Sequence, residues 1–157
     1  MTRATVESLA SAIVESASLI LKLIDECPDH LWNEKAGKWP IWQHLAHCAS
    51  ASNFFLPGER VPLAPGLTEA LVDFEVVGTE PVSKDALRAS FKAAQIKLDN
   101  FLAPLKDEDL SKDNQHLKAY GLDWSIVKTL SLVSGHFYYH LGNADAVLRS
   151  HGHQGIF

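Results

Sequence analysis

Three stretches of this 157-residue chain repeat apolar residues at steps of three and four, which is the period of an amphipathic helix, and a fourth stretch is also strongly helical. They lie at about residues 5–26, 40–56, 84–105 and 124–149. Alternation with a period of two persists in no strand-length run, apart from an ambiguous stretch at residues 72–77. The sequence therefore predicts an all-α fold in which the four helices pack as a bundle.

A long connection rich in proline and glycine separates the second predicted helix from the third. Its helix-breaking residues are Pro57, Gly58, Pro62, Pro65, Gly66, Gly78 and Pro81. These leave room for at most a short helical piece around residues 68–74. A connection of this length lets two successive helices run parallel, and long loops are often binding elements. We therefore expect a four-helix bundle with a long crossover between helices 2 and 3.

Local signals predict where the helices begin and end. Pro40 suits the first position of the second helix, Ser83 can cap the third, and Asp123 can cap the last. We expect the tail at residues 151–155 to be mobile, because two glycines in five residues stop the helix.

Composition limits the classes of function. The length and the 46% apolar content predict one domain, residues 1–157, with a substantial core. The net charge is −5 and the basic residues are scattered, so we expect no nucleic-acid partner. We find no run of about 18 apolar residues and no signal-like N-terminus, so we expect a cytoplasmic protein without a membrane partner. Cys27 and Cys48 lack a motif, and we assign them no redox role.

Two histidines, His136 and His140, lie one helical turn apart near the C-terminal end. At about 100° per residue they are about 40° apart on one helix face, and His140 falls on the apolar stripe. His47 lies in the second predicted helix, which a bundle can place opposite the pair. Three protein ligands with water or substrate in the remaining position are typical of catalytic metal sites. We predict a three-histidine divalent metal site whose rings lie within about 5 Å of one another.

Spacing alone leaves a second interpretation open, because a single helical histidine more often packs in the core and hydrogen-bonds a carbonyl. Three other metalloprotein classes are excluded. A di-iron bundle needs Glu-x-x-His pairs, which are absent, and the His-Glu-x-x-His metalloprotease pattern has Phe137 at the glutamate position. Two histidines one turn apart cannot face each other across a haem. The residues identify no catalytic acid or base.

Two motifs resemble those of the DinB-like (damage-inducible protein) superfamily. Residues 37–47, GKWPIWQHLAH, are similar to its second-helix signature, in which a tryptophan precedes the helix and a late histidine is a metal ligand. Residues 136–152 resemble its last-helix pattern of His, three residues, His, one residue, Gly-Gln, then Leu-Arg and Gly. The order and separation of the two motifs also fit, so the resemblance covers nearly the whole chain.

The resemblance implies that His47, His136 and His140 are metal ligands. Characterised relatives include metal-dependent transferases and isomerases that use low-molecular-weight thiols. The resemblance therefore implies a metal that lowers the pKa of a thiol or of water, a small-molecule substrate under the crossover, and a homodimer. We expect zinc or nickel, with iron or manganese as alternatives. The competing hypotheses are a non-catalytic metal or small-ligand binding protein on the same bundle, and a helical interaction module without metal.

Three further residues are candidates for contacts around the metal or the substrate. His44 can be a fourth ligand, a hydrogen-bond partner of a ligand, or a surface residue. Asn143 stands where the family usually has Gln, and its amide can orient a bound water or a ring nitrogen, or simply pack in the helix. Tyr139 is a candidate substrate contact or proton donor beside the chelating pair.

Overall fold

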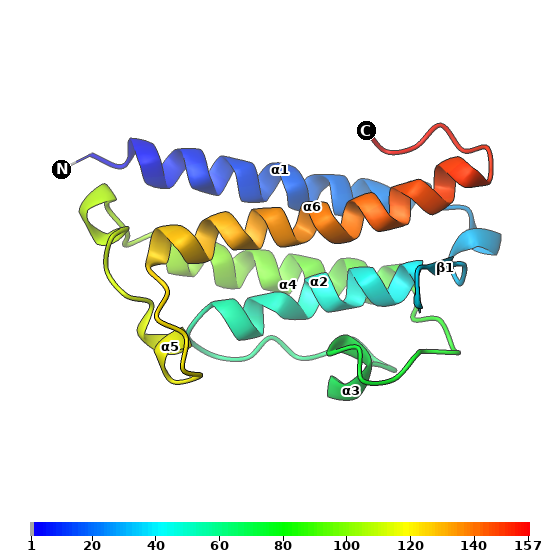
Figure 1. The fold of residues 1–157 in the computed structure, drawn as a ribbon, viewed down its shortest axis with the longest axis horizontal. Coiled ribbons are helices and arrows are strands. Elements are labelled where there is room, and N and C mark those ends of the chain that lie inside the picture. Colours follow the sequence, from blue (N-terminus) through cyan, green and yellow to red (C-terminus); the bar gives the residue numbers. More distant parts are fainter. Residues whose placement is uncertain (1) are drawn as a thin grey trace.

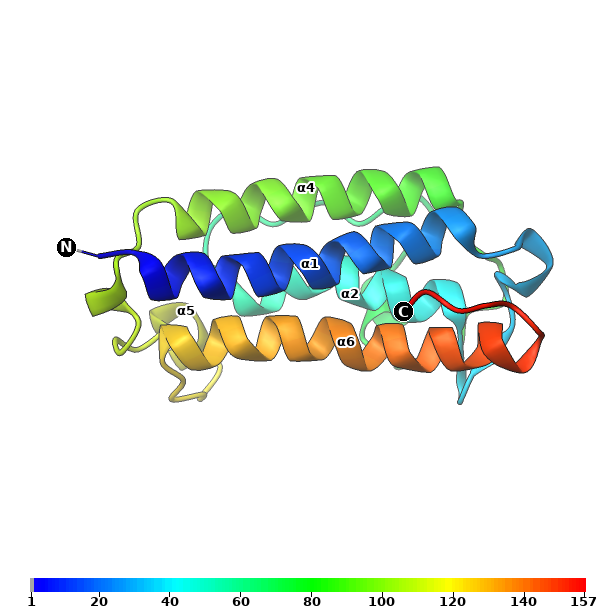
Figure 2. The same cartoon turned by 90° about the horizontal axis from the view of Figure 1, so that it is seen from above.

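The computed structural model describes residues 2–157, which fold as an all-α bundle (Figure 1). Its long helices within this range are α1 (Ala4–Glu26), α2 (Ile41–Phe55), α4 (Lys84–Leu102) and α6 (Ile126–Ser150). Shorter elements are α3 (Glu69–Val72), α5 (Gln115–Lys118), and the 3-10 turns Asp29–Leu31 and Asp107–Asp109. Helices α1 and α6 run in one direction, whereas α2 and α4 run in the other (Figures 1 and 2).

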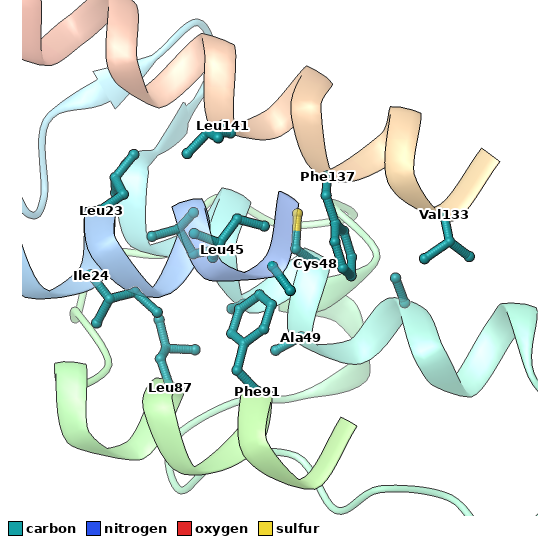
Figure 3. Packing of buried hydrophobic residues seen from close by; sticks show 14 of the residues in the cluster. Leu23, Ile24, Leu45, Cys48, Ala49, Leu87, Phe91, Val133, Phe137 and Leu141 are labelled. Atoms are coloured by element: carbon teal, nitrogen blue, oxygen red, sulfur yellow. The ribbon is translucent and has the colours of Figure 1, made fainter. Parts of the chain in front are cut away.

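The four long helices form a closed ring of neighbours around one apolar core. Helix α1 packs against α4 and α6, and α2 packs against the same two helices. Figure 3 shows where the faces meet: Leu45, Leu87, Phe91, Phe137 and Leu141 point to a common centre. Each is at most 7% exposed, and burying a side chain of this kind stabilises the fold by about 1.5–3 kcal/mol.

Helix α1 departs from one sequence expectation. Within residues 2–157 it is long and apolar enough, by length and composition, to cross a membrane, so the expectation that no such segment exists was wrong. Core helices of bundles and signal sequences meet the same criterion. The side chains of Ile13, Ile20 and Ile24 are fully buried, and they face α4 and α6 in the bundle. Packing inside the bundle therefore accounts for the apolar stripe of α1.

The helix ends follow side-chain capping, with corrections to two expectations. Ser83 caps α4, as expected, by accepting a hydrogen bond from Ala86 N at 3.2 Å. The cap of α6 is Ser125 rather than Asp123, because a bridge with Asp113 keeps the chain extended up to Ser125. Pro40 precedes α2 instead of starting it, because it belongs to a small hairpin.

That hairpin closes one end of the bundle. Strands β1 (Lys35–Ala36) and β2 (Trp39–Pro40) pair antiparallel, with Ala36 opposite Trp39. The turn between them contains Gly37 with φ of 72°, a left-handed conformation that glycine adopts without strain. The hairpin places the carbonyl of Ala36 beside the first turns of α2, where it contacts the functional site.

The crossover at residues 56–83 joins the parallel helices α2 and α4 and carries α3 on the outer side of α2 (Figure 1). The ambiguous stretch at residues 72–77 contains the last residue of α3 followed by a turn and bends, and it forms no strand. Gln43 of α2, which is fully buried, holds this region: its amide donates to Leu71 O at 2.8 Å and to Val76 O at 2.7 Å. Its carbonyl oxygen accepts from Gly78 N at 2.8 Å. One side chain of α2 therefore makes three hydrogen bonds to the crossover.

The C-terminal tail folds back on the bundle through Ile156 and Phe157, just beyond the residues 151–155 for which mobility was predicted. The carboxylate of Asp145, which is 4% exposed, accepts hydrogen bonds from Ile156 N and from Arg149 Nε. Phe157 stacks on Tyr138 with ring centroids 6.4 Å apart. A buried carboxylate needs hydrogen-bond donors, and the tail supplies one of them.

Candidate metal centre

Three histidine rings from two helices meet where α2 crosses the middle of α6. The ring centroids of His47 lie 4.8 Å from those of both His136 and His140, and the centroids of His136 and His140 are 4.6 Å apart. One ring nitrogen from each residue lies within 4.8 Å of the other two. The rings therefore satisfy the expected limit of about 5 Å, and this group could hold a metal ion.

A backbone carbonyl of the crossover sets the orientation of His47. Nδ1 of His47 lies 2.5 Å from Val72 O. A carbonyl oxygen can only accept a hydrogen bond, so Nδ1 carries the proton and Nε2 of the neutral ring keeps a free lone pair. A ligand histidine in proteins almost always has such a partner on its second nitrogen.

His44 sets the tautomer of His140 in the same way. Nε2 of His44 lies 2.8 Å from Ala36 O and must donate to it, which leaves Nδ1 as an acceptor. That Nδ1 is 2.8 Å from Nδ1 of His140, so His140 donates there and its Nε2 keeps the lone pair. His44 is only 3% exposed, which excludes the surface position considered for it. The geometry places it behind His140 as a hydrogen-bond partner.

The third ring carries an unsatisfied nitrogen. Nε2 of His136 is buried and has no hydrogen-bond partner among the described residues. Leaving such a group unpaired costs about 1–3 kcal/mol, and a bound cation would remove that cost. His47 and His140 thus offer Nε2 as a ligand atom, and the unpartnered Nε2 of His136 is the third candidate. Three imidazole ligands suit zinc and the other divalent ions expected from the sequence.

Burial keeps the four imidazoles neutral. Desolvation, followed by the charge of His47, lowers the pKa of His136 to about 4. Desolvation lowers the pKa of His140 to about 2, and the neighbouring histidines add to the effect. The pKa values of His44 and His47 are also lowered, again mainly by desolvation. Because a metal ligand must be unprotonated, these shifts favour metal binding at neutral pH.

A cleft of about 440 Å³ opens onto His47 and His136. Its lining includes the apolar rings of Phe54 and Phe55. The remaining lining residues are Ser50, Ala51, Asn53, Arg60, Glu69, Asp73 and Tyr120. Among these, the guanidinium of Arg60 pairs with the carboxylate of Glu69 at 2.8 Å. The cleft can therefore hold a small molecule with both apolar and charged parts next to the metal ligands.

Two other candidate residues lie beside the cluster without sharing its buried space. Tyr139 is 66% exposed, and its ring meets His140 edge to face with centroids 5.0 Å apart. Asn143 donates its side-chain amide to Tyr139 O at 2.8 Å, within its own helix. This bond uses the amide for helix packing, the second of the two roles considered for it.

Several groups around the cluster have no counterpart in the sequence motifs. The carbonyls of Ala36 and Val72 are backbone groups, which leave no mark in a sequence. Arg60, Asp73 and Tyr120 of the cleft come from connecting segments without periodicity. The only signal for them was the unusual length of the crossover, which indicated a binding element but not its residues.

Comparison with known proteins gives a family match. A family model described as the DinB superfamily matches residues 12–144, a range that includes the three histidines and the whole crossover. No curated protein and no solved structure matches the chain.

Proposed function

The chain belongs to the DinB superfamily, and we propose that it binds one divalent metal ion through His47, His136 and His140 and catalyses a transfer or isomerisation with a low-molecular-weight thiol. The observation that carries this proposal is a group of three histidines with ligand atoms within 4.8 Å of one another, two of which, His47 and His136, line a cleft. Structural metal sites are usually closed by four protein ligands, whereas catalytic sites keep a position open. Three histidines beside a cleft fit the second class.

The residues around the cleft support this chemistry. A divalent cation bound there lowers the pKa of a thiol or water molecule that reaches it, which supplies a nucleophile near neutral pH. The apolar rings of Phe54 and Phe55 exclude water from one side of a bound molecule. Asp73 lines the same cleft, and in this proposal its carboxylate accepts the proton that the thiol loses. Arg60 and Glu69 offer charges of both signs to the rest of the substrate.

Five properties belong to this proposal. The metal is zinc or nickel, with iron and manganese as alternatives, because three neutral imidazoles accept all of these ions. The substrate is a small molecule that enters beneath the crossover. The protein is a single domain, and it acts in the cytoplasm as a homodimer.

A non-catalytic metal or small-ligand binding protein is the second candidate. It is favoured by the pairing of Arg60 with Glu69, since these two charges of the cleft already neutralise each other. Binding needs only the metal ligands and the cleft, so turnover of a substrate distinguishes the two candidates.

The test is thioether formation by untagged, metal-loaded protein with glutathione or cysteine and 1-chloro-2,4-dinitrobenzene. In this reaction the thiol loses its proton, a carbon–sulfur bond forms, and chloride leaves with the electron pair of its carbon–chlorine bond. We expect turnover by the wild type to stop when a chelator is added and to return with metal. We expect no turnover by His47→Ala. The matched control is His30→Ala, which removes an exposed histidine outside the cluster. Stoichiometric metal binding without turnover across small thiols would favour the second candidate.

A further inference from the structure

Phe74, at the end of α3, has an unusual backbone conformation. Within residues 2–157 it is the non-glycine residue with a positive φ, 59°. Its N–H donates to Leu71 O at 3.3 Å, and the next N–H, of Glu75, donates to Ala70 O at 2.9 Å. These two bonds form a Schellman motif, whose left-handed position is usually glycine because a side chain there is strained. The chain therefore keeps a phenylalanine where local structure favours glycine.

The ring of Phe74 lies on the histidine cluster. Its centroid is 4.5 Å from that of His47, 5.4 Å from that of His44 and 5.6 Å from that of His140. On its other side it packs on Trp39 at 4.3 Å. One aromatic ring thus contacts two of the three metal-ligand candidates, His47 and His140. It also contacts His44, the hydrogen-bond partner of His140.

The surrounding structure holds Phe74 in place. We call residues 70–78 the cap turn. The buried amide of Gln43 makes three hydrogen bonds to this turn, at Leu71, Val76 and Gly78. At Gly78 the turn approaches Trp42 so closely that a Cβ atom would lie 2.2 Å from the indole ring. Strained residues persist where neighbouring contacts fix them, and they concentrate at functional sites.

The two sides of the cluster are consequently different. The cleft reaches His47 and His136, whereas His140 is covered by Phe74 and His44. The same short segment also supplies Val72 O, which orients His47. The cap turn therefore aligns His47 through Val72 O, contributes Asp73 to the lining of the cleft, and covers His140, which the cleft does not reach, with the ring of Phe74.

We propose that Phe74 is a positioning residue that seals the covered side of the metal site, so that water, substrate and competing ligands reach the ion only through the cleft. This inference rests on the proposed metal site. Because the apolar shell around a metal controls solvent access, removal of the ring should open a second route to the ion. The strain at Phe74 is then retained for the sake of this seal, since glycine would satisfy the backbone.

The test measures how fast zinc passes from the loaded, untagged protein to an excess of the chelating dye 4-(2-pyridylazo)resorcinol. We expect release from Phe74→Gly and Phe74→Ala to be about tenfold faster than from wild type. Phe74→Leu, which keeps an apolar cover, should lie between them. Gln43→Leu frees the cap turn but keeps the ring, and it should also accelerate release. Phe157→Ala, which removes an exposed ring at the far end of the tail, is the control and should match wild type.

Thermal midpoints of the metal-free variants separate the seal from the strain. Phe74→Gly should melt above Phe74→Ala, because both lack the ring but only glycine is relaxed at positive φ. Equal release rates in wild type, Phe74→Gly and Phe74→Ala, with zinc bound tightly by all three, would overturn this inference alone. Failure of the wild type to bind zinc would overturn both it and the proposed function.

Discussion

The two faces of α6 differ in what determines them. One face carries Val133, Phe137 and Leu141, which are buried in the core against the other long helices (Figure 3). The other carries His136 and His140, which meet His47 of α2 and the crossover. The apolar face needs only residues of suitable size at the helical period. The histidine face needs hydrogen-bond acceptors at fixed positions, and these come from Ala36 and His44, far away in the sequence.

The comparison shows that core packing and the proposed metal ligands lie on different faces of a single helix. Apolar packing is non-directional, so the core face tolerates changes in detail as long as volume is kept. The imidazole face depends on which nitrogen carries a proton, and that is decided by single contacts. Variants on one face should therefore change the free energy of unfolding, and variants on the other should change metal affinity.

The largest effect is expected on the core face. Leu141→Ala should lower the free energy of unfolding by about 2–5 kcal/mol, because the side chain of Leu141 is fully buried and its removal leaves a cavity in the core. Chemical denaturation of the metal-free protein measures this loss. The folded variant should still bind one metal ion per chain. A Leu141→Ala variant that is folded but metal-free would show that the two faces are coupled.

Metal should stabilise the native bundle through the histidine face alone. At a free zinc concentration of about 100 times the dissociation constant, unfolding should cost about 2.7 kcal/mol more than in a chelator. His136→Ala should lose this increment, because only two of the three donors remain. Thermal melts with and without metal measure it. An equal metal-dependent shift in His136→Ala and wild type would contradict the assignment of His136.

The contact from His44 to His140 should affect affinity by a smaller amount. His44→Phe keeps the volume but leaves Nδ1 of His140 without its acceptor, and we expect zinc affinity to fall about 10–100-fold. His44→Asn places a carbonyl oxygen near the lost nitrogen and should restore part of the affinity. Competition titrations with a zinc dye compare the three proteins. Equal losses in both variants would indicate that His44 only fills space.

Acid should weaken the metal-free bundle through the same face. The native pKa values are about 4 for His136 and about 2 for His140, below the ordinary 6.5 of an unfolded histidine. The unfolded chain therefore binds protons first as the pH falls below 6.5, and stability decreases toward pH 4. The slope approaches about 1.4 kcal/mol per pH unit for each histidine. His140→Phe should show a shallower slope in denaturation series from pH 7 to 5, and an unchanged slope would contradict the prediction.

Apolar periodicity was enough to predict the bundle, its crossover and the faces of the helices. It placed α1, α4 and α6 within a few residues of their observed bounds, because helices that pack on a common core repeat at a fixed period. The spacing of His136 and His140, with His47 on a facing helix, predicted three rings that the structure brings together. The pairing of His136 with His140 follows from their local spacing in one helix, whereas the position of His47 beside them depends on how the helices pack.

The features that the sequence could not predict are those made by distant contacts. The cap at Ser125 depends on the bridge to Asp113, and the docked tail depends on the buried carboxylate of Asp145. Phe74 even opposes its local preference, since its position in the Schellman motif favours glycine. Backbone carbonyls that fix a tautomer are equivalent in every residue, so no residue type marks them. Such contacts become visible only once the chain is folded.

The metal content of protein purified without an affinity tag, measured by elemental analysis, tests the three-histidine site most directly. We expect one divalent ion per chain in wild type and in His30→Ala, and none in His47→Ala at the same protein concentration. A folded wild-type protein that stays metal-free after exposure to zinc and nickel would contradict the account. Full metal content in His47→Ala would contradict it equally, because the ion would then be held elsewhere.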